Sequence, residues 1–443
     1  MDSVNRLGPK CPMLNAPAAP RRLLHLMVSF AVVFSTTAFG QETESEWGVE
    51  VRGFALGTYS GRTTGHVPSG SEGRALLLGE ERLRLDLTGW TDAVEAEVRI
   101  KLDGIHDAVA DDFDLDLREA YLDYTTGDLD FRLGRQIATW GVGDLLFIND
   151  VFPKDWVSFF SGRPLEYLKI GVDGLRARYS SDVLNAELLA IPRFEPDTLP
   201  TPKRFFLHDD YGSVTNRDEE LPDTTLGNSE VGLRLYRKFG GLDLSAYAYR
   251  GRWRAPGQRA DDPNNATRVT SIYPPLSVYG LSAQGQALGG VVSLEGGYYD
   301  SRDDRGGGDP AVPNSQVRLL AGYQKQLWQD FTLGAQYYVE IMGDFDAYER
   351  ALPAGFARKE EYRDIVTLRL TQLLEHETWK LSLFAFYSPA ENDYLLQPQV
   401  SYKVSDSLSV ALGGNVFGGE TRTTFFGQFD QDDNAYLAVR YDF

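Results

Sequence analysis

Strict alternation of apolar and polar side chains is the feature of this sequence that most limits its fold. In residues 82–88 and 93–103, aliphatic side chains occupy every second position and charged ones occupy most positions between them. Successive side chains of a β-strand point to opposite faces, so each segment would form a strand with one apolar and one polar face. A strand between lipid and a water-filled lumen requires this alternation, because every charge must point inward. The pattern predicts an all-β, transmembrane, antiparallel up-and-down β-barrel.

The same rule, applied along the chain, predicts about eighteen strands, whose lengths suit tilted membrane strands. Their expected ranges are 47–59, 74–89, 93–103, 113–124, 129–137, 166–179, 182–192, 229–239, 241–253, 274–286, 289–300, 314–327, 330–343, 361–374, 377–389, 393–404, 406–418 and 433–443. Sixteen is the alternative number, because 274–286 and 406–418 show the pattern weakly. Short turns alternate with long loops, so the short turns and both chain ends are expected on the periplasmic side.

Tryptophans fall at the ends of the expected strands. Indole rings prefer membrane interfaces, where the ring is buried and the N–H stays hydrated. The expected periplasmic end holds Trp47, Trp90, Trp328 and Trp379, and an external end holds Trp253. This grouping supports the predicted topology.

The last eight residues, 436–443, form one more alternating segment that ends on a phenylalanine. This ending resembles the C-terminal signal by which the barrel-assembly machinery recognises bacterial outer-membrane barrels. The resemblance implies that Tyr441 and Phe443 act as an assembly signal, and that the chain lies in the outer membrane of a Gram-negative bacterium. The expected partners are then the assembly machinery, outer-membrane lipid and lipopolysaccharide.

The amino-terminal end has the pattern of a signal peptide. Two arginines precede the apolar stretch 23–39, and small residues end it, so cleavage is expected between Gly40 and Gln41. As a membrane anchor the stretch would be short, since about 20 apolar residues span the hydrocarbon layer. The prediction is a signal peptide at 1–40 and a single β-barrel domain at 41–443.

Charge and missing motifs limit the chemistry. Residues 1–40 hold four of the 44 basic and one of the 64 acidic residues, so the remainder carries a net charge of −23. This charge argues against nucleic acid as a partner. Cys11 is the single cysteine and precedes the expected cleavage site. No metalloprotease, nucleophile-elbow or phosphate-loop motif is present, and His208, followed by two aspartates, is the nearest approach to a hydrolytic group. We therefore predict no enzymatic activity, no cofactor and no metal site.

The connection between the expected strands 129–137 and 166–179 is too apolar for an exposed loop. Residues 138–163 include Trp140, Trp156 and several phenylalanines. These side chains need burial, and in a barrel the available place is the lumen. We predict that the segment folds inward and narrows the channel. The two tryptophans either pack against the wall, which we favour, or contact solute.

Arg135, Asp144 and Asp150 are charged residues of the same region. Arg135 either pairs with one of the two aspartates and fixes the segment, or faces the permeating solute. We favour pairing, because a buried guanidinium more often has a carboxylate partner than not.

This region also carries a recognisable motif, formed by Gly134-Arg135-Gln136, Trp140-Gly141, Asp150-Val151 and Pro153. It resembles the G-[KR]-Q…W-G…D-V-x-x-P pattern of a family of poorly characterised, porin-like outer-membrane barrels of Gram-negative bacteria. Members commonly have asparagine before the proline, where this chain has Phe152. The resemblance implies a barrel with an inward segment, which serves the transport of poorly soluble molecules together with an inner-membrane exporter.

Charged residues at inner-facing positions are expected to line a hydrated lumen. The predicted pore-lining residues are Arg82, Arg84, Arg99, Arg118, Arg132, Arg176 and Arg178, together with Glu95 and Glu97. Opposed charges across a narrow pore would create a transverse field that favours polar solutes. Alternatively, neighbouring residues neutralise one another as cross-strand pairs, each contributing roughly 0.2–1 kcal/mol.

The acidic excess predicts a modest preference for cations over anions. Reversal potentials measured across a salt gradient test this prediction, and a preference for anions would contradict it.

Together these patterns predict a porin-like channel for the passive passage of small solutes. The alternative is a conduit or docking component of a multi-protein export or lipid-transport system, which requires a periplasmic or exporter partner. A barrel hydrolase is the third interpretation.

Overall fold

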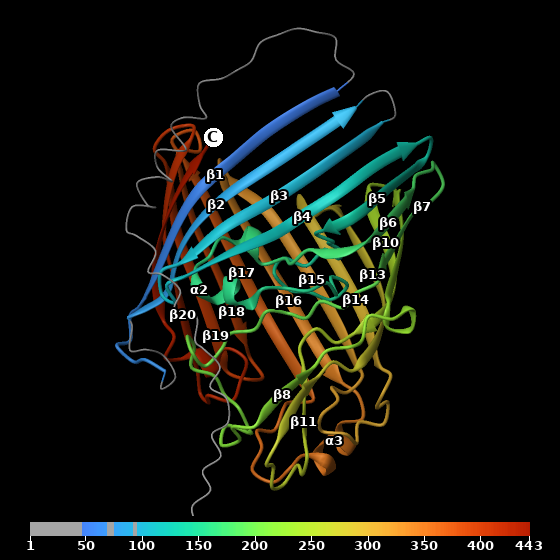
Figure 1. Cartoon of the computed structure of the whole chain (residues 1–443), viewed down its shortest axis with the longest axis vertical. Helices are drawn as coiled ribbons and strands as arrows, with labels where there is room; N and C mark the ends of the chain where they lie inside the picture. Colours follow the sequence, from blue (N-terminus) through green and yellow to red (C-terminus); the bar gives the residue numbers. More distant parts are fainter. Residues whose placement is uncertain (1–46, 69–74, 92–94) are drawn as a thin grey trace, which may run out of the picture. The chain divides into compact units, whose positions relative to one another are not determined.

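The computed structural model describes residues 47–68, 75–91 and 95–443. The expected signal peptide and its cleavage site lie outside these residues. Eighteen strands form one closed antiparallel sheet, in which each strand pairs with the next and the last returns to the first (Figure 1). In chain order they are β1 (Trp47–Arg62), β2 (Leu76–Thr91), β3 (Ala96–Asp107), β4 (Asp112–Thr126), β5 (Leu129–Gln136), β6 (Val172–Tyr179), β7 (Asn185–Ile191), β9 (Glu230–Phe239), β10 (Leu242–Arg252), β13 (Pro275–Ala287), β14 (Gly290–Ser301), β15 (Gln316–Trp328), β16 (Phe331–Met342), β17 (Tyr362–Leu374), β18 (Trp379–Ser388), β19 (Asp393–Lys403), β20 (Leu408–Gly419) and β21 (Asn434–Asp442).

The eighteen-strand prediction is confirmed, and the alternative of sixteen is wrong. Each expected range contains one barrel strand, with small shifts at the ends. The largest shift is in 166–179, where the strand begins only at Val172 because residues before it belong to the preceding connection. Near residue 90 the strand β2 continues to Thr91, through a stretch expected to be a turn.

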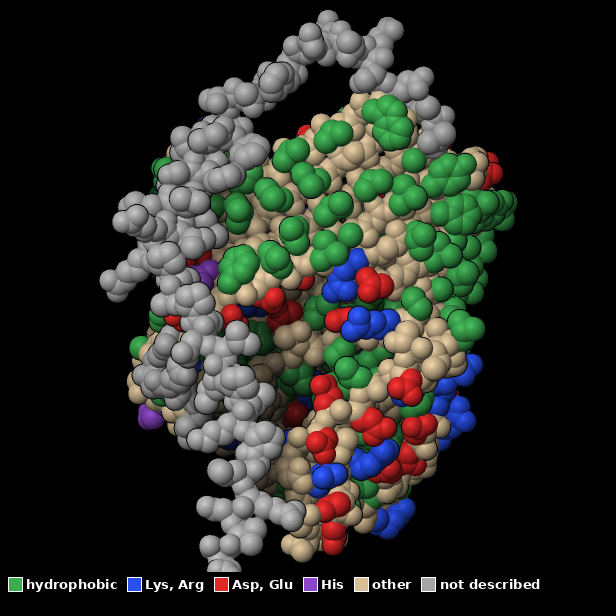
Figure 2. All heavy atoms as spheres, in the orientation of Figure 1, with side chains coloured by type: hydrophobic (Ala, Val, Ile, Leu, Met, Phe, Trp, Pro, Cys, Tyr) green, Lys and Arg blue, Asp and Glu red, His purple; other side chains and the backbone are tan. Residues whose placement is uncertain are grey.

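The barrel wall has its apolar side chains outside and its charges inside. On β2 and β3, Leu85 and Ile100 are 36% and 37% exposed, whereas Arg84 and Asp103 on the opposite faces are 7% and 0% exposed. Figure 2 shows apolar side chains covering the outside of the wall formed by β1–β4. A surface of this kind is stable in contact with lipid. Among the described residues, no helix is long and apolar enough to cross a membrane.

All the long loops lie at one end of the strands and most short turns at the other, as predicted; the short connections 108–111 and 389–392 lie at the long-loop end. Trp47, Trp90, Trp328 and Trp379 all lie at the short-turn end. Trp253 follows β10 at the long-loop end, as expected, but the interfacial role expected for it is wrong. Its ring is buried against Tyr299 and its indole N–H donates to Ser301, so it packs inside instead of marking an interface.

The long loops carry structure of their own. The short strands β8 (Arg217–Glu220), β11 (Gly257–Ala260) and β12 (Val269–Ile272) form a separate three-stranded sheet, and a neighbouring loop holds α3 (Phe345–Ala351). Figure 1 shows these elements gathered at the long-loop end. The alternation rule did not predict this sheet, because its strands are too short to show a period.

Candidate functional site

Residues 137–171, called the inward segment below, connect β5 to β6. They include the short helix α2 (Trp156–Ser161) and the 3-10 turn η2 (Leu165–Tyr167). Figure 1 shows α2 inside the ring of strands. The side chains that bind the segment come from the inner faces of strands around the barrel, so it crosses the lumen. The predicted inward fold of 138–163 agrees with this position.

Glu295 on β14 holds the first half of the inward segment. Its carboxylate accepts hydrogen bonds from the backbone N–H groups of Val142 at 2.8 Å, Gly143 at 3.0 Å and Asn149 at 2.8 Å. The side-chain amide of Asn149 donates to it as well, at 2.9 Å. Hydrogen bonds to an ionised acceptor are stronger than neutral ones, and Glu295 is only 5% exposed. One buried carboxylate therefore ties together both sides of a tight bend.

The tip of this bend is held by β16 and β17, which lie two and three strands from β14 in the sheet. Gln336 on β16 exchanges two hydrogen bonds with the backbone of Asp144, one accepted at 2.8 Å and one donated at 2.9 Å. The Asp144 carboxylate pairs with Arg369 on β17 at 3.0 Å. Burial raises the pKa of Asp144, and Arg369 opposes that shift. The hydroxyl of Tyr299 also donates to the carbonyl of Ile148.

Trp140 is fixed against β7 and β10, which lie four and two strands from β14 in the sheet. Its indole N–H donates to Glu187 on β7 at 2.7 Å, and its ring packs edge-on against Phe152. Tyr247 on β10 lies 5.7 Å from it, centroid to centroid. At 3% exposure Trp140 has no surface left for solute. The packing interpretation of this residue is the one the geometry supports.

Glycines in the wall make room for the inward segment. A Cβ on Gly280 would lie 1.7 Å from Oδ1 of Asn149, and one on Gly297 would lie 2.7 Å from a methyl of Ile148. At Gly232 a Cβ would lie 2.5 Å from the Trp140 ring. Real side chains do not approach so closely, so these positions act as notches in the inner face.

A buried lysine connects the middle of the segment. Lys154 Nζ donates to the backbone carbonyls of Asp150 at 2.7 Å and Phe152 at 2.8 Å, and contacts the Asp150 carboxylate at 3.3 Å. The other carboxylate oxygen of Asp150 pairs with Lys169 at 2.9 Å. Burial lowers the pKa of Lys154, while the Asp150 charge opposes the shift. Asp150 therefore joins two parts of the inward segment, at Lys154 and at Lys169, to each other.

Trp156 begins α2 and reaches a second loop. Its indole N–H donates to Asp197 at 2.9 Å, and the other oxygen of Asp197 accepts the backbone N–H of Lys154 at 2.8 Å. Unlike Trp140, Trp156 is only partly buried. It packs against the core together with Phe147 and Phe425, which are partly exposed as well. Solute contact at Trp156 stays a prediction.

The helix α2 is anchored to the last strands of the barrel. Gln397 on β19 donates to the carbonyl of Phe159 at 3.0 Å, and Asn434 on β21 donates to that of Phe160 at 3.2 Å. The rings of both phenylalanines are buried in a cluster of aromatic side chains. Its further members are Phe205, Phe386, Phe417, Phe426 and Phe429.

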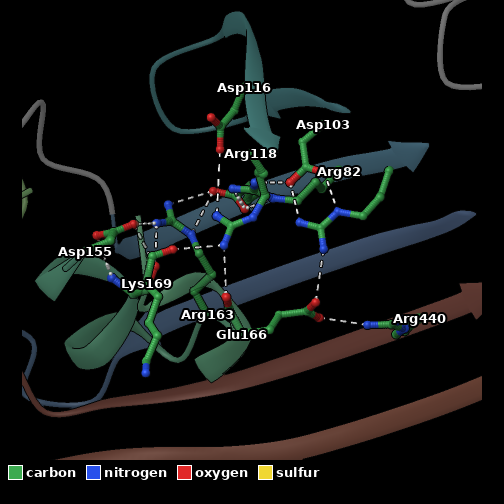
Figure 3. A network of polar contacts seen from close by, with 12 residues as sticks. Arg82, Asp103, Asp116, Arg118, Asp155, Arg163, Glu166, Lys169 and Arg440 are labelled. Atoms are coloured by element: carbon green, nitrogen blue, oxygen red, sulfur yellow. Dashed lines mark hydrogen bonds and ion pairs between the residues drawn. The ribbon is translucent and has the colours of Figure 1, made fainter. Parts of the chain in front are cut away.

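The end of the inward segment lies among arginines of β2 and β4 (Figure 3). The Tyr167 ring is 1% exposed, and the guanidinium groups of Arg82, Arg84 and Arg118 lie 4.0, 4.9 and 4.7 Å from its centroid. Burial raises the pKa of Tyr167, so its phenol stays neutral. The adjacent Glu166 pairs with Arg84 at 3.1 Å and with Arg440 on β21 at 2.8 Å.

Most predicted pore-lining charges pair with a neighbour on the same wall. Arg99 binds Asp86, Arg132 binds Asp123 and Arg178 binds Glu187. Arg82 and Arg84 share Asp103, whereas Arg118 donates to backbone carbonyls of the inward segment. Arg176 and Glu97 occupy inner-facing positions of β6 and β3. These pairs favour the interpretation that neighbouring charges neutralise one another. They do not favour a transverse field across the pore.

Two predicted site residues are placed differently. Arg135 shares the outer face of β5 with Leu133 and pairs with Asp173 at 3.6 Å, so its pairing with Asp144 or Asp150 is wrong. The two-residue period of the strand puts Arg135 on that outer face. The sequence-based prediction followed the motif around Arg135 instead of this period. Glu95 lies in the turn before β3 with φ of 47°, exposed, and does not line the lumen.

Sequence reasoning missed the residues that hold the inward segment from the wall. Glu295 and Gln336 are the clearest of these. Their inner-facing positions follow from the alternation, but the sequence gives no sign of which loop they bind. The glycine-rich stretch after Glu295 was the one available signal, since glycine in a strand often marks a close approach.

His208 shows no hydrolytic arrangement. Its Nε2 lies 3.0 Å from Oδ1 of Asp210, and the same oxygen accepts the backbone N–H of Ala357 in another loop. The pair therefore connects two loops. In the part of the chain that the structure describes, no three His, Cys, Asp or Glu side chains are grouped to hold a metal ion.

Residues 82–301 match the model of a family described as "Protein of unknown function (DUF1302)". This range runs from β2 to the end of β14 and contains the inward segment and Glu295. No curated protein matches the sequence.

Solved structures with the same fold are porins of Gram-negative outer membranes. OccK2 (OpdF) of Pseudomonas aeruginosa, solved in complex with glucuronate, has a TM-score of 0.55 and 10% identity, covering 89% of this chain and 97% of that one. OccAB3 of Acinetobacter baumannii has a TM-score of 0.53 and 11% identity, with 89% and 99% covered. At such identities the likeness shows the fold: this chain is a closed, porin-type barrel.

Proposed function

We propose that this protein is a porin-like channel in the outer membrane of a Gram-negative bacterium. Small polar solutes pass through it by diffusion, and the inward segment narrows its lumen. Outer-membrane lipid and lipopolysaccharide surround the barrel, and the assembly machinery recognises Tyr441 and Phe443. The apolar outer wall and charged inner wall support this environment, because only a strand between lipid and water needs both.

The observation that carries the proposal is the attachment of the inward segment. Polar residues of β2, β7, β14, β16, β17, β19 and β21 bind it from the inner face. A loop that served only to connect two strands would gain nothing from crossing the lumen, where it costs conformational entropy. Fixed in place, it sets the width of the path and the side chains that a solute meets.

Purified protein in planar bilayers tests the proposal. Ohmic current steps of uniform size are expected, because the segment is fixed and the lumen is lined with neutralised ion pairs. A heat-unfolded sample serves as the control. Bilayers that stay silent with folded, fully inserted protein would contradict a channel.

A partner-dependent conduit is the second candidate. The dense aromatic packing between α2 and the last strands favours it, since such packing restricts the free cross-section of the lumen. Silent bilayers, together with specific copurification of a periplasmic protein or an exporter, would support this candidate. A barrel hydrolase has no observation in its favour.

A further inference from the structure

Strand β4 extends beyond its neighbour β5. On one side it pairs with β3 from Asp112 to Tyr124, but on the other it pairs with β5 only from Ala120 to Thr126. Within the described ranges, no strand pairs with residues 112–119 on that second side. The neighbouring strands β5, β6 and β7 have eight, eight and seven residues, whereas a tilted membrane strand needs about 9–11. The wall is therefore short beside the first half of β4.

The unpaired half of β4 is open on both faces. Asp112, Phe113, Asp114 and Leu115 are all exposed, although alternate residues point to opposite sides of the sheet. The backbone N–H groups of Phe113 and Leu115 are capped by the carboxylates of Asp112 and Asp114, both at 2.8 Å. Figure 2 shows a hollow next to the lower edge of this apolar wall. Two backbone N–H groups of this half of β4 thus bond side chains of the same strand.

The two sides of this edge differ in chemistry. The outer side is apolar, with Phe113, Leu115 and Leu117 exposed by 54%, 61% and 42%. The inner side carries Asp112, Asp114 and Asp116. The lipid-facing surface of β4 therefore continues to the unpaired edge, while polar groups begin directly behind it.

The inward segment forms the inner margin of the gap. Arg118, two residues before the paired half, donates to the carbonyls of Glu166 and Lys169, both at 3.0 Å. The backbones approach so closely there that a Cβ on Gly171 would lie 2.4 Å from the Arg118 carbonyl oxygen. These contacts between β4 and the inward segment close the gap at Arg118, so it does not extend further along β4.

We propose that the gap beside residues 112–117 is a lateral opening between the lumen and the surrounding lipid. An open strand edge is not tolerated in hydrocarbon unless it borders a polar cavity, and this edge has lipid-facing side chains on one side and carboxylates on the other. The molecule that fits is an uncharged amphiphile with an apolar chain, since the aspartates disfavour anions and Arg118 is already engaged. This inference rests on the proposed channel and adds a second exit to it.

Single cysteines test the opening, because the described residues contain none. Leu115→Cys places a thiol at the unpaired edge, and Leu122→Cys places one on the same outer face where β4 is paired on both sides. Each variant is folded, alkylated with a bulky maleimide and reconstituted into phosphatidylcholine vesicles. A neutral, fluorescent long-chain alcohol is delivered from a soluble carrier. Its rate of arrival in the bilayer is compared with that in protein-free vesicles.

We expect the unlabelled variants to accelerate transfer, the adduct at position 115 to abolish the acceleration, and the adduct at 122 to leave it unchanged. Equal effects of both adducts, or no acceleration by a protein that conducts ions normally, would overturn the lateral opening while leaving the channel intact. If the unlabelled protein conducts no ions at all, the proposed channel function is rejected instead.

A second measurement does not depend on transport. A bimane label at Leu115→Cys should be quenched by brominated phospholipid, and one at Asp114→Cys by aqueous iodide. Failure of either quencher would overturn the proposal. Protection of position 114 in cell envelopes that disappears on purification would assign the edge to a strand of a protein partner, and would overturn it as well.

Discussion

Deletion of residues 140–160, with a short Gly-Ser bridge in their place, should raise the single-channel conductance on the order of threefold, as expected when an internal constriction is removed from a wide barrel. The deletion removes the bend held by Glu295 and most of α2. It leaves β5 and β6 intact, because their eight paired residues lie outside the deleted stretch. The barrel should therefore still close and insert, which is checked by its heat-dependent mobility on gels.

A control deletion removes residues from an external loop. Deletion of 345–358 takes away α3 and the residues after it, whose hydrogen bonds and ring contacts join them to other external-loop residues such as Asp210 and Tyr211. Its conductance should stay close to that of the unchanged protein. If the 140–160 deletion folds and conducts no better than this control, the inward segment is not the constriction.

Glu295→Ala should release the bend without disturbing the barrel. Four donors lose their acceptor at once, and each unpaired group that stays buried costs about 1–3 kcal/mol. The segment should leave this position, so we expect larger and noisier current steps. The temperature of barrel unfolding should change little, because the strand ladder does not include these bonds.

Two further variants separate the effect from a general loss of inner charge. Asp86→Asn removes a carboxylate that pairs with Arg99 on the wall and leaves the segment untouched, so its current noise should be unchanged. Gly280→Val pushes against Asn149 from the neighbouring strand and should reproduce the effect of Glu295→Ala. Equal noise in Asp86→Asn and Glu295→Ala would show that charge, and not attachment, governs the current.

The alternation of side chains determines most of the fold, because a strand between lipid and water leaves no freedom in which face is polar. It located the eighteen strands and their order around the barrel. It failed where a contact does not repeat with a period: the sheet of β8, β11 and β12, the burial of Trp253, and the hold of Glu295 on a loop some 150 positions earlier in the chain. Aromatic content located the inward segment, since rings such as Trp140 and Phe160 need burial. For Arg135, the family-like motif outweighed the two-residue period, and the period was right.

The closure of β21 onto β1 makes the scaffold self-sufficient. Every barrel strand pairs with two neighbours, although residues 112–119 of β4 pair on one side alone, and the described strand ladder does not include residues 137–171. A different segment between β5 and β6 would need its own fit to the three notches at Gly232, Gly280 and Gly297. For protein engineering, residues 137–171 are therefore a replaceable segment. Substitutes for it can be screened for how well they fit the lumen while the barrel strands stay unchanged.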